Sequence, residues 1–122
     1  MNKIICIIVF FVLLPSQVLA NELLVVSGEN SKNSKKWKKE VLQEYIQSEM
    51  GKKNPAKIVS IEGDKFPKWF MKAMEEERIG QILGTPTFII WDSVNKKELG
   101  RLEGFTQKSK FYTELREALL QI

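Results

Sequence analysis

The chain has 122 residues and a formal net charge of +4, because 19 lysines and arginines outnumber 15 aspartates and glutamates. It contains no histidine and one cysteine, Cys6, which excludes Cys/His and Ser/His nucleophile pairs and zinc, iron–sulfur and haem sites of the usual kinds. Lysine and glutamate are interleaved along the chain, and the basic stretch at residues 34–39 lacks the aromatic spacing of nucleic-acid-binding segments. We therefore expect no metal, no cofactor and no nucleic-acid partner.

The N-terminus has the three parts of a secretory signal peptide. Lys3 is followed by an unbroken apolar run at residues 4–14, and small or compact residues occupy positions 18–20, which a signal peptidase reads. The apolar run is shorter than the ~20 residues that an α-helix needs to cross a bilayer. We expect residues 1–20 to be removed, together with the only cysteine, and residues 21–122 to form one periplasmic or secreted domain. An uncleaved N-terminal anchor is the alternative.

Apolar periodicity and turn residues predict seven elements after the signal peptide. In chain order we expect a strand at 23–27, a helix at 34–50 ended by 51–55, a strand at 56–61, a helix opened by Asp64 and Pro67, strands at 87–91 and 98–103, and a last helix capped by Thr106. A β-α-β crossover makes the first two strands parallel, and the short polar turn before the fourth strand makes the last two antiparallel. The predicted class is α/β, with the order β-α-β-α-β-β-α and a four-stranded mixed sheet flanked by helices on both faces.

Large side chains are expected mainly in the core. Trp37, Trp69 and Trp91 follow the periodicity of buried residues, so we predict core positions for them rather than ligand-stacking ones. Ile46 belongs to the apolar stripe of the first helix. For Phe105 the sequence does not decide between a core position and a ligand-binding position.

Two motifs resemble those of thioredoxin-fold proteins. Residues 84–88, Gly-Thr-Pro-Thr-Phe, begin a strand and are followed at 100–105 by Gly-Arg-Leu-Glu-Gly-Phe. In that family the proline is cis and lies opposite a redox-active Cys-x-x-Cys-x-x-Trp at the start of the first helix. Residues 31–37 here read Ser-Lys-Asn-Ser-Lys-Lys-Trp. Over residues 23–120 the chain is most similar to the small periplasmic thioredoxins of the SoxS type, linked to sulfur oxidation, with both cysteines replaced by serine.

The resemblance implies thiol–disulfide oxidoreductase ancestry, whereas Ser31 and Ser34 argue against that activity. Exchange requires a thiolate, and the family uses the helix N-terminus to lower the pKa of its first cysteine below the free value of ~8.5. A serine hydroxyl is far less acidic and forms no disulfide. We predict that Ser31 caps the helix and that Ser34 lies in its first turn. Two alternatives remain: the hydroxyls bind a ligand in the old groove, or the serines were engineered in place of native cysteines.

The resemblance also implies a peptide-binding position at Thr85 and Pro86. In the family, the backbone of the residue before the cis-proline pairs with an extended segment of the partner, which is a form of strand addition. The plainer interpretation is that Pro86 only shapes the loop before a strand. We predict a redox-inactive protein-binding or chaperone-like module whose partner is a periplasmic protein or an extended peptide segment. A periplasmic thiol–disulfide oxidoreductase, should the serines replace native cysteines, and a structural subunit without a groove function are the alternatives.

Overall fold

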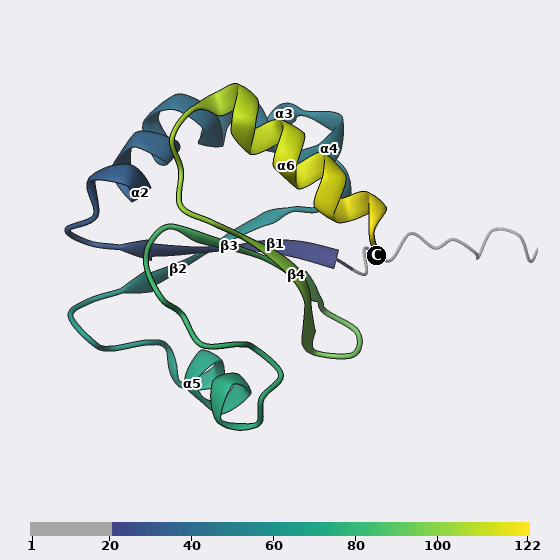
Figure 1. The fold of residues 1–122 in the computed structure, drawn as a ribbon. Coiled ribbons are helices and arrows are strands. Elements are labelled where there is room, and N and C mark those ends of the chain that lie inside the picture. The colour runs from purple at the N-terminus through teal and green to yellow at the C-terminus, as the bar shows by residue number, and fades with distance from the viewer. Residues whose placement is uncertain (1–20) are drawn as a thin grey trace, which may run out of the picture.

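The computed structural model describes residues 21–122, and the signal peptide predicted at residues 1–20 lies outside them. The elements alternate along the chain as Figure 1 shows, with helices above and below one sheet. In order they are β1 (Asn21–Gly28), α2 (Lys32–Trp37), a π-helical segment η1 (Lys38–Leu42), α3 (Gln43–Gln47), α4 (Glu49–Lys53), β2 (Ala56–Ile61), α5 (Lys68–Glu75), β3 (Thr87–Asp92), β4 (Lys97–Glu103) and α6 (Lys108–Leu120).

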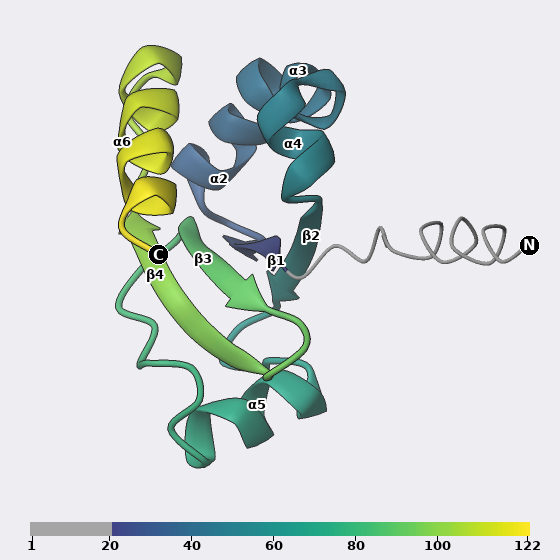
Figure 2. The same ribbon diagram turned by 90° about the vertical axis from the view of Figure 1, so that its right-hand side faces the viewer.

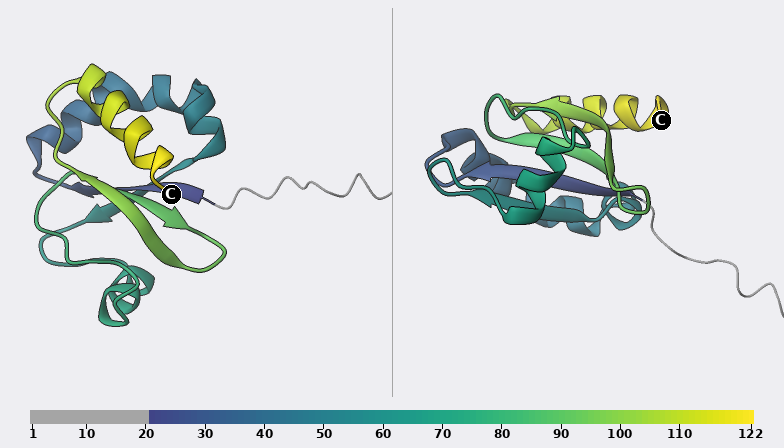
Figure 3. Two further views of the ribbon diagram at one scale, coloured as in Figure 1. Left: turned by 45° about the vertical axis from the view of Figure 1, so that its right-hand side comes forward. Right: turned by 90° about the horizontal axis from the view of Figure 1, so that it is seen from below.

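The four strands form one mixed sheet in the order β2-β1-β3-β4. β1 and β2 run parallel, with Leu23 opposite Ala56, whereas β1 and β3, and β3 and β4, run antiparallel. Helices α2, α3, α4 and α6 cover one face of the sheet and α5 covers the other (Figures 2 and 3). The predicted α/β class, the strand directions and the helices on both faces are therefore confirmed.

The central strand β1 supplies both hydrophobic cores because successive side chains of a strand point to opposite faces. Leu23 and Val25 pack under α2, η1, α3 and α6, whereas Leu24 and Val26 pack under α5. All four are at most 1% exposed. An apolar run without alternation is typical of such a strand, which is buried on both faces.

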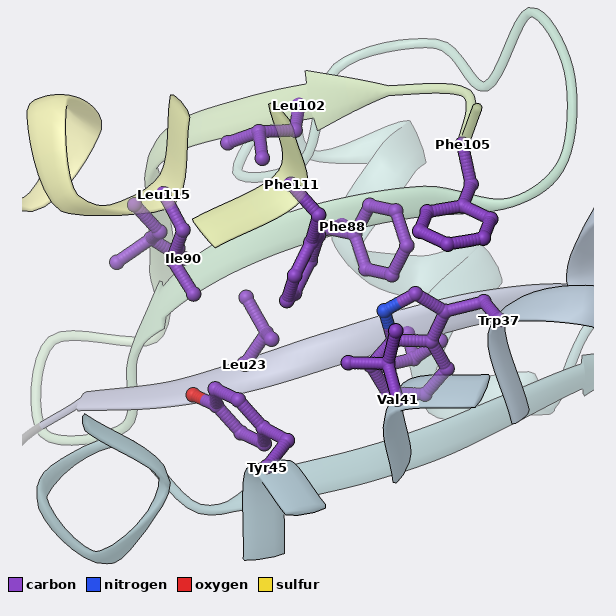
Figure 4. Close-up of a cluster of buried hydrophobic side chains, with 11 residues drawn as sticks. Leu23, Trp37, Val41, Tyr45, Phe88, Ile90, Leu102, Phe105, Phe111 and Leu115 are labelled. Carbon is purple, nitrogen blue, oxygen red and sulfur yellow. The ribbon is translucent and has the colours of Figure 1, made fainter. Parts of the chain in front are cut away.

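Phe111 of α6 lies at the centre of the larger core. Its ring centroid is 4.8 Å from that of Phe88, 5.6 Å from Trp37 and 6.4 Å from Phe105. The four rings gather between α6, α2 and the sheet in Figure 4. The pairs with Trp37 and Phe105 are edge to face, and such pairs add about 0.5–1.5 kcal/mol each beyond the area that they bury. This cluster fixes α2, and therefore its first turn, against the sheet.

The first helix departs from the single segment predicted at residues 34–50. It ends at Ser48, whose ψ of 162° is extended, and the chain then starts the separate helix α4. The Ser48 hydroxyl donates to the Tyr45 carbonyl at 2.7 Å and accepts from the Gly51 amide at 3.0 Å, so it closes one helix and caps the next. Gly51 was expected to end the helix but lies inside α4. The turn leaves Ile46 49% exposed, so its predicted place in the apolar stripe is wrong.

Three smaller expectations are corrected. The last helix is capped at Gln107 rather than Thr106, whose carbonyl instead accepts from the Lys36 ammonium at 2.8 Å. Asp64 lies in a turn before α5, which begins after Pro67. Trp69 is 38% exposed because it lies at the edge of the smaller core, whereas Trp37 and Trp91 are buried as predicted. Phe105 is buried as well.

Among residues 21–122, no helix combines the length and the hydrophobicity that a bilayer span requires.

Candidate functional site

The candidate site begins where β1 passes into α2. Ser31 has an extended backbone, with φ −85° and ψ 116°, and its hydroxyl accepts a hydrogen bond from the Ser34 amide at 3.1 Å. This is the geometry of an N-cap, which satisfies one of the free amides of a helix start. Ser31 is half-buried, and its carbonyl accepts from the Lys35 amide at 3.1 Å. Ser31 is therefore the N-cap of α2, as the sequence predicted.

Ser34 points into the protein instead of toward solvent. Ser34 is only 1% exposed, and its hydroxyl accepts a hydrogen bond from the Gly28 amide at 3.3 Å. Ser34 thus ties the first turn of α2 back to the end of β1. Of the two serines, only Ser31 lies where a bound molecule could reach it.

The loop before β3 lies directly against Ser31. The Thr85–Pro86 peptide bond is cis, and the Ser31 hydroxyl donates to the Thr85 carbonyl at 3.2 Å. The approach is close: a Cβ added at Gly28 would lie 2.9 Å from the Thr85 hydroxyl. The structure therefore brings together all four positions singled out in the sequence, Ser31, Ser34, Thr85 and Pro86, although they come from two segments about fifty residues apart.

Hydrogen bonds hold the backbone around Pro86 in place. The Thr87 hydroxyl donates to the Gly84 carbonyl at 2.6 Å, and the Pro86 carbonyl accepts from the Gly104 amide at 2.8 Å. By contrast, the Thr85 amide donates to no other residue within 21–122. Thr85 thus offers one unused donor and a carbonyl with one remaining lone pair.

A groove of about 530 Å³ opens beside these residues. Its walls come from three places: the end of β1 and start of α2, the segment after β2, and the loop before β3. Leu83 lies in the last of these and is 74% exposed, next to the half-buried Ile82, and Phe66 lines the groove from the segment after β2. The sequence interpretation missed these apolar lining residues. The signal that could have found them is a pair of large apolar side chains in a loop bounded by Gly80 and Gly84.

An ion pair on the edge strand β4 holds this loop. Arg101 donates to both oxygens of Glu98, at 2.6 and 2.8 Å, and Glu98 also accepts from the Gly80 amide at 2.8 Å. The Arg101 guanidinium donates further to the Gln81 carbonyl at 2.8 Å. Burial alone would raise the pKa of Glu98, but the hydrogen bonds from Arg101 and Gly80 outweigh it and hold that pKa below its usual value. The pair therefore stays charged at neutral pH and fixes the stretch that leads to Leu83.

The chemistry available in the groove is hydrogen bonding and apolar contact. The described residues contain no thiol and no imidazole. Within the same range, no group of three or more carboxylate, thiol or imidazole side chains could hold a metal ion. The Ser31 hydroxyl is engaged with two backbone groups, the Ser34 amide and the Thr85 carbonyl, and forms no hydrogen bond with a side-chain base among residues 21–122.

The fold is similar to those of solved structures, among them two thioredoxins. The periplasmic thioredoxin SoxS from Paracoccus pantotrophus, in its reduced form, superposes with a TM-score of 0.65 at 21% identity, over 83% of this chain and 97% of that one. A thioredoxin from Thermus thermophilus gives 0.52 at 19% identity, over 83% of this chain and 75% of that one. Neither a family model nor a curated protein matches the sequence. The chain therefore has a thioredoxin-like fold, similar to that of the SoxS-type thioredoxin, and the resemblance stated from residues 31–37 and 84–88 is confirmed for the fold.

Proposed function

We propose that this protein is a redox-inactive, thioredoxin-like binding module that holds an extended segment of a protein partner in the groove beside Thr85. The observation that carries the proposal is the contact between Ser31 and the Thr85 carbonyl, 3.2 Å apart. It joins the position of the family's reactive thiol, here a serine, to the backbone that the family uses for binding. A serine at this position cannot carry out thiol–disulfide exchange, whereas the Thr85 backbone beside it can still bind an extended segment.

The mode of binding follows from the free backbone groups. An extended segment that runs beside Thr85 can accept a hydrogen bond from its unused amide and donate one to its carbonyl, as in strand addition. The Ser31 hydroxyl does not block this arrangement, because a carbonyl oxygen accepts two hydrogen bonds. Main-chain bonds then supply affinity for many sequences, and Leu83, Ile82 and Phe66 favour an apolar side chain beside the paired residue.

The test is binding of a peptide selected from a random library on the unmodified protein. Leu83→Gln is expected to weaken that binding by about tenfold, since it removes apolar contact at the groove wall. Leu120→Gln is the matched control, because Leu120 is 78% exposed on α6 and lies outside the groove. Titration by calorimetry measures both variants. Equal affinities for Leu83→Gln and Leu120→Gln would place the peptide elsewhere and reject the groove.

A second candidate is a thiol–disulfide oxidoreductase whose native form carries cysteines at positions 31 and 34. The observation in its favour is that the two serines occupy the N-cap and the first turn of α2, the register of a Cys-x-x-Cys pair. Sequencing the native gene distinguishes the two candidates. Cysteine codons at both positions would reject the binding-module proposal and favour the oxidoreductase.

We also propose that the protein is exported, from the charged, apolar and small-residue order of residues 1–20. Cleavage after Ala20 leaves Asn21 at the start of β1 and removes Cys6. The intact mass of protein recovered from the periplasm or medium is expected to correspond to residues 21–122. Recovery of the protein from the membrane fraction with Met1 at its N-terminus would contradict cleavage and favour the uncleaved N-terminal anchor.

A further inference from the structure

A second cavity lies at the opposite end of the strands from the groove. The groove adjoins the ends of β1 and β2 and the start of β3, whereas this cavity adjoins the starts of β1 and β2 and the end of β3. Its volume is about 680 Å³, within the range of small-molecule sites. It contains none of the residues of the groove, so the two sites are independent. We refer to it as the tryptophan cavity.

Three neighbouring strands and one helix build the floor of the tryptophan cavity. Glu22 of β1 lies opposite Trp91 of β3 in the antiparallel register, and Lys57 of β2 lies opposite Leu24. All three side chains share the sheet face of Leu24, which is the face under α5. The helix adds Trp69 and Lys72, three residues apart and therefore on one side. The backbone positions of these residues are fixed by regular structure.

The two tryptophans provide an aromatic surface. Trp69 and Trp91 pack edge to face with their ring centroids 6.1 Å apart. Trp91 is only 5% exposed and serves as the support, whereas Trp69 is 38% exposed and presents its ring to the cavity. Phe70 and Ala73 of the same helix are buried, so Trp69 is the aromatic side chain of α5 that faces the cavity, where the Lys57 ammonium lies over its ring.

The charged lining has an excess of positive charge. Of its four cations, Arg78 is neutralised by Glu76 at 2.8 Å and is held further by the Lys96 carbonyl at 3.0 Å. No carboxylate within residues 21–122 forms an ion pair with Lys57, Lys72 or Lys96. The Lys57 ammonium lies 4.7 Å from the centroid of the Trp69 ring. Three lysines and an aromatic ring thus line a cavity whose one remaining carboxylate is Glu22.

We propose that the tryptophan cavity binds a small organic anion that joins a flat ring to a phosphate or sulfate group. The ring packs against Trp69 in place of the Lys57 ammonium, and the anionic group accepts charge-assisted hydrogen bonds from Lys57 and Lys72. The ligand therefore needs both the flat ring and the anionic group. Inorganic phosphate makes no aromatic contact with Trp69, and an uncharged ring leaves the lysine ammonium groups without a counter-charge.

Phenyl phosphate is the probe that tests this inference, on protein expressed from the full-length sequence and labelled with ¹⁵N. The three tryptophans give three indole N–H signals. Titration is expected to move those of Trp69 and Trp91 with a dissociation constant of about 1 mM or below, and to leave that of the core residue Trp37 in place. Inorganic phosphate and phenol, each added alone, are expected to bind at least about tenfold more weakly.

Paired lysine variants locate the anionic group. Lys57→Gln/Lys72→Gln is expected to weaken binding of phenyl phosphate at least about tenfold, whereas Lys52→Gln/Lys53→Gln on α4 changes it less than about twofold. An unchanged Trp37 signal shows that each variant is folded. Three results would overturn the inference: unmoved Trp69 and Trp91 signals, equal binding of phenol, or equal losses in both pairs of variants. Because the groove shares no residue with this cavity, none of them bears on peptide binding.

Discussion

A Ser31→Cys/Ser34→Cys variant is expected to accelerate the reduction of insulin by dithiothreitol at least about tenfold over the uncatalysed rate, while the unchanged protein stays at that rate. The reason is that, of the groups needed for thiol–disulfide exchange, the site lacks only the two thiols. Position 31 already caps α2 and lies 3.2 Å from the Thr85 carbonyl, and a thiol at a helix N-terminus has its pKa lowered below ~8.5. Insulin precipitation followed by turbidity measures both proteins.

Ser34→Cys alone is the control for this variant. Position 34 is 1% exposed, so its thiol is expected to be unreactive and the single variant to remain inactive. Catalysis by the unchanged protein would contradict the account, because residues 21–122 contain no sulfur nucleophile. An inactive double variant that keeps its fold would show that the site has lost more than its cysteines.

Gly51→Ala is expected to lower the free energy of unfolding by about 2–3 kcal/mol, and the melting temperature by about 10 °C or more. A Cβ at this position would overlap the Tyr45 carbonyl oxygen and lie 2.8 Å from the carbonyl carbon. Both atoms are backbone, so α3 and α4 must move apart to accept the methyl group. That movement would also disturb Ser48, which joins the two helices. Thermal unfolding followed by circular dichroism measures the loss.

Gly84→Ala provides the comparison for Gly51→Ala. A Cβ at Gly84 would meet nothing within 4 Å, and its φ lies outside the range that disfavours other residues. We expect its stability to stay within about 0.5 kcal/mol of the unchanged protein. Equal melting temperatures for Gly51→Ala and the unchanged protein would mean that α3 and α4 separate at no cost, against the geometry described here.

The regular part of this fold could be predicted because each local pattern has a single strong interpretation. The apolar run at Leu23–Val26 requires burial on both faces, and the Ala56–Ile61 strand was predicted with its observed bounds. The break at Ser48 could not be predicted. Its cause is a pair of side-chain hydrogen bonds to Tyr45 and Gly51, and a serine followed by glutamate also fits the interior of a helix.

The candidate site was predicted only in part, for a similar reason. Ser31, Ser34, Thr85 and Pro86 were found because they fill a spaced motif with a family resemblance. Leu83 was not, because a lone exposed leucine is common at protein surfaces and becomes informative only when the fold places it on a groove. The Glu98–Arg101 pair depends on a loop crossing the edge of β4, a contact that sequence spacing does not reveal.

Hydrogen exchange at the Thr85 amide tests the central claim most directly. In the free protein this amide has no hydrogen-bond partner within residues 21–122, so fast exchange is expected. In the complex with the library-selected peptide, pairing with the docked segment is expected to slow exchange at Thr85 at least about tenfold, as measured by NMR. If the peptide is bound at saturation and Thr85 exchanges as fast as before, partners do not dock on this backbone and the binding-module account is wrong.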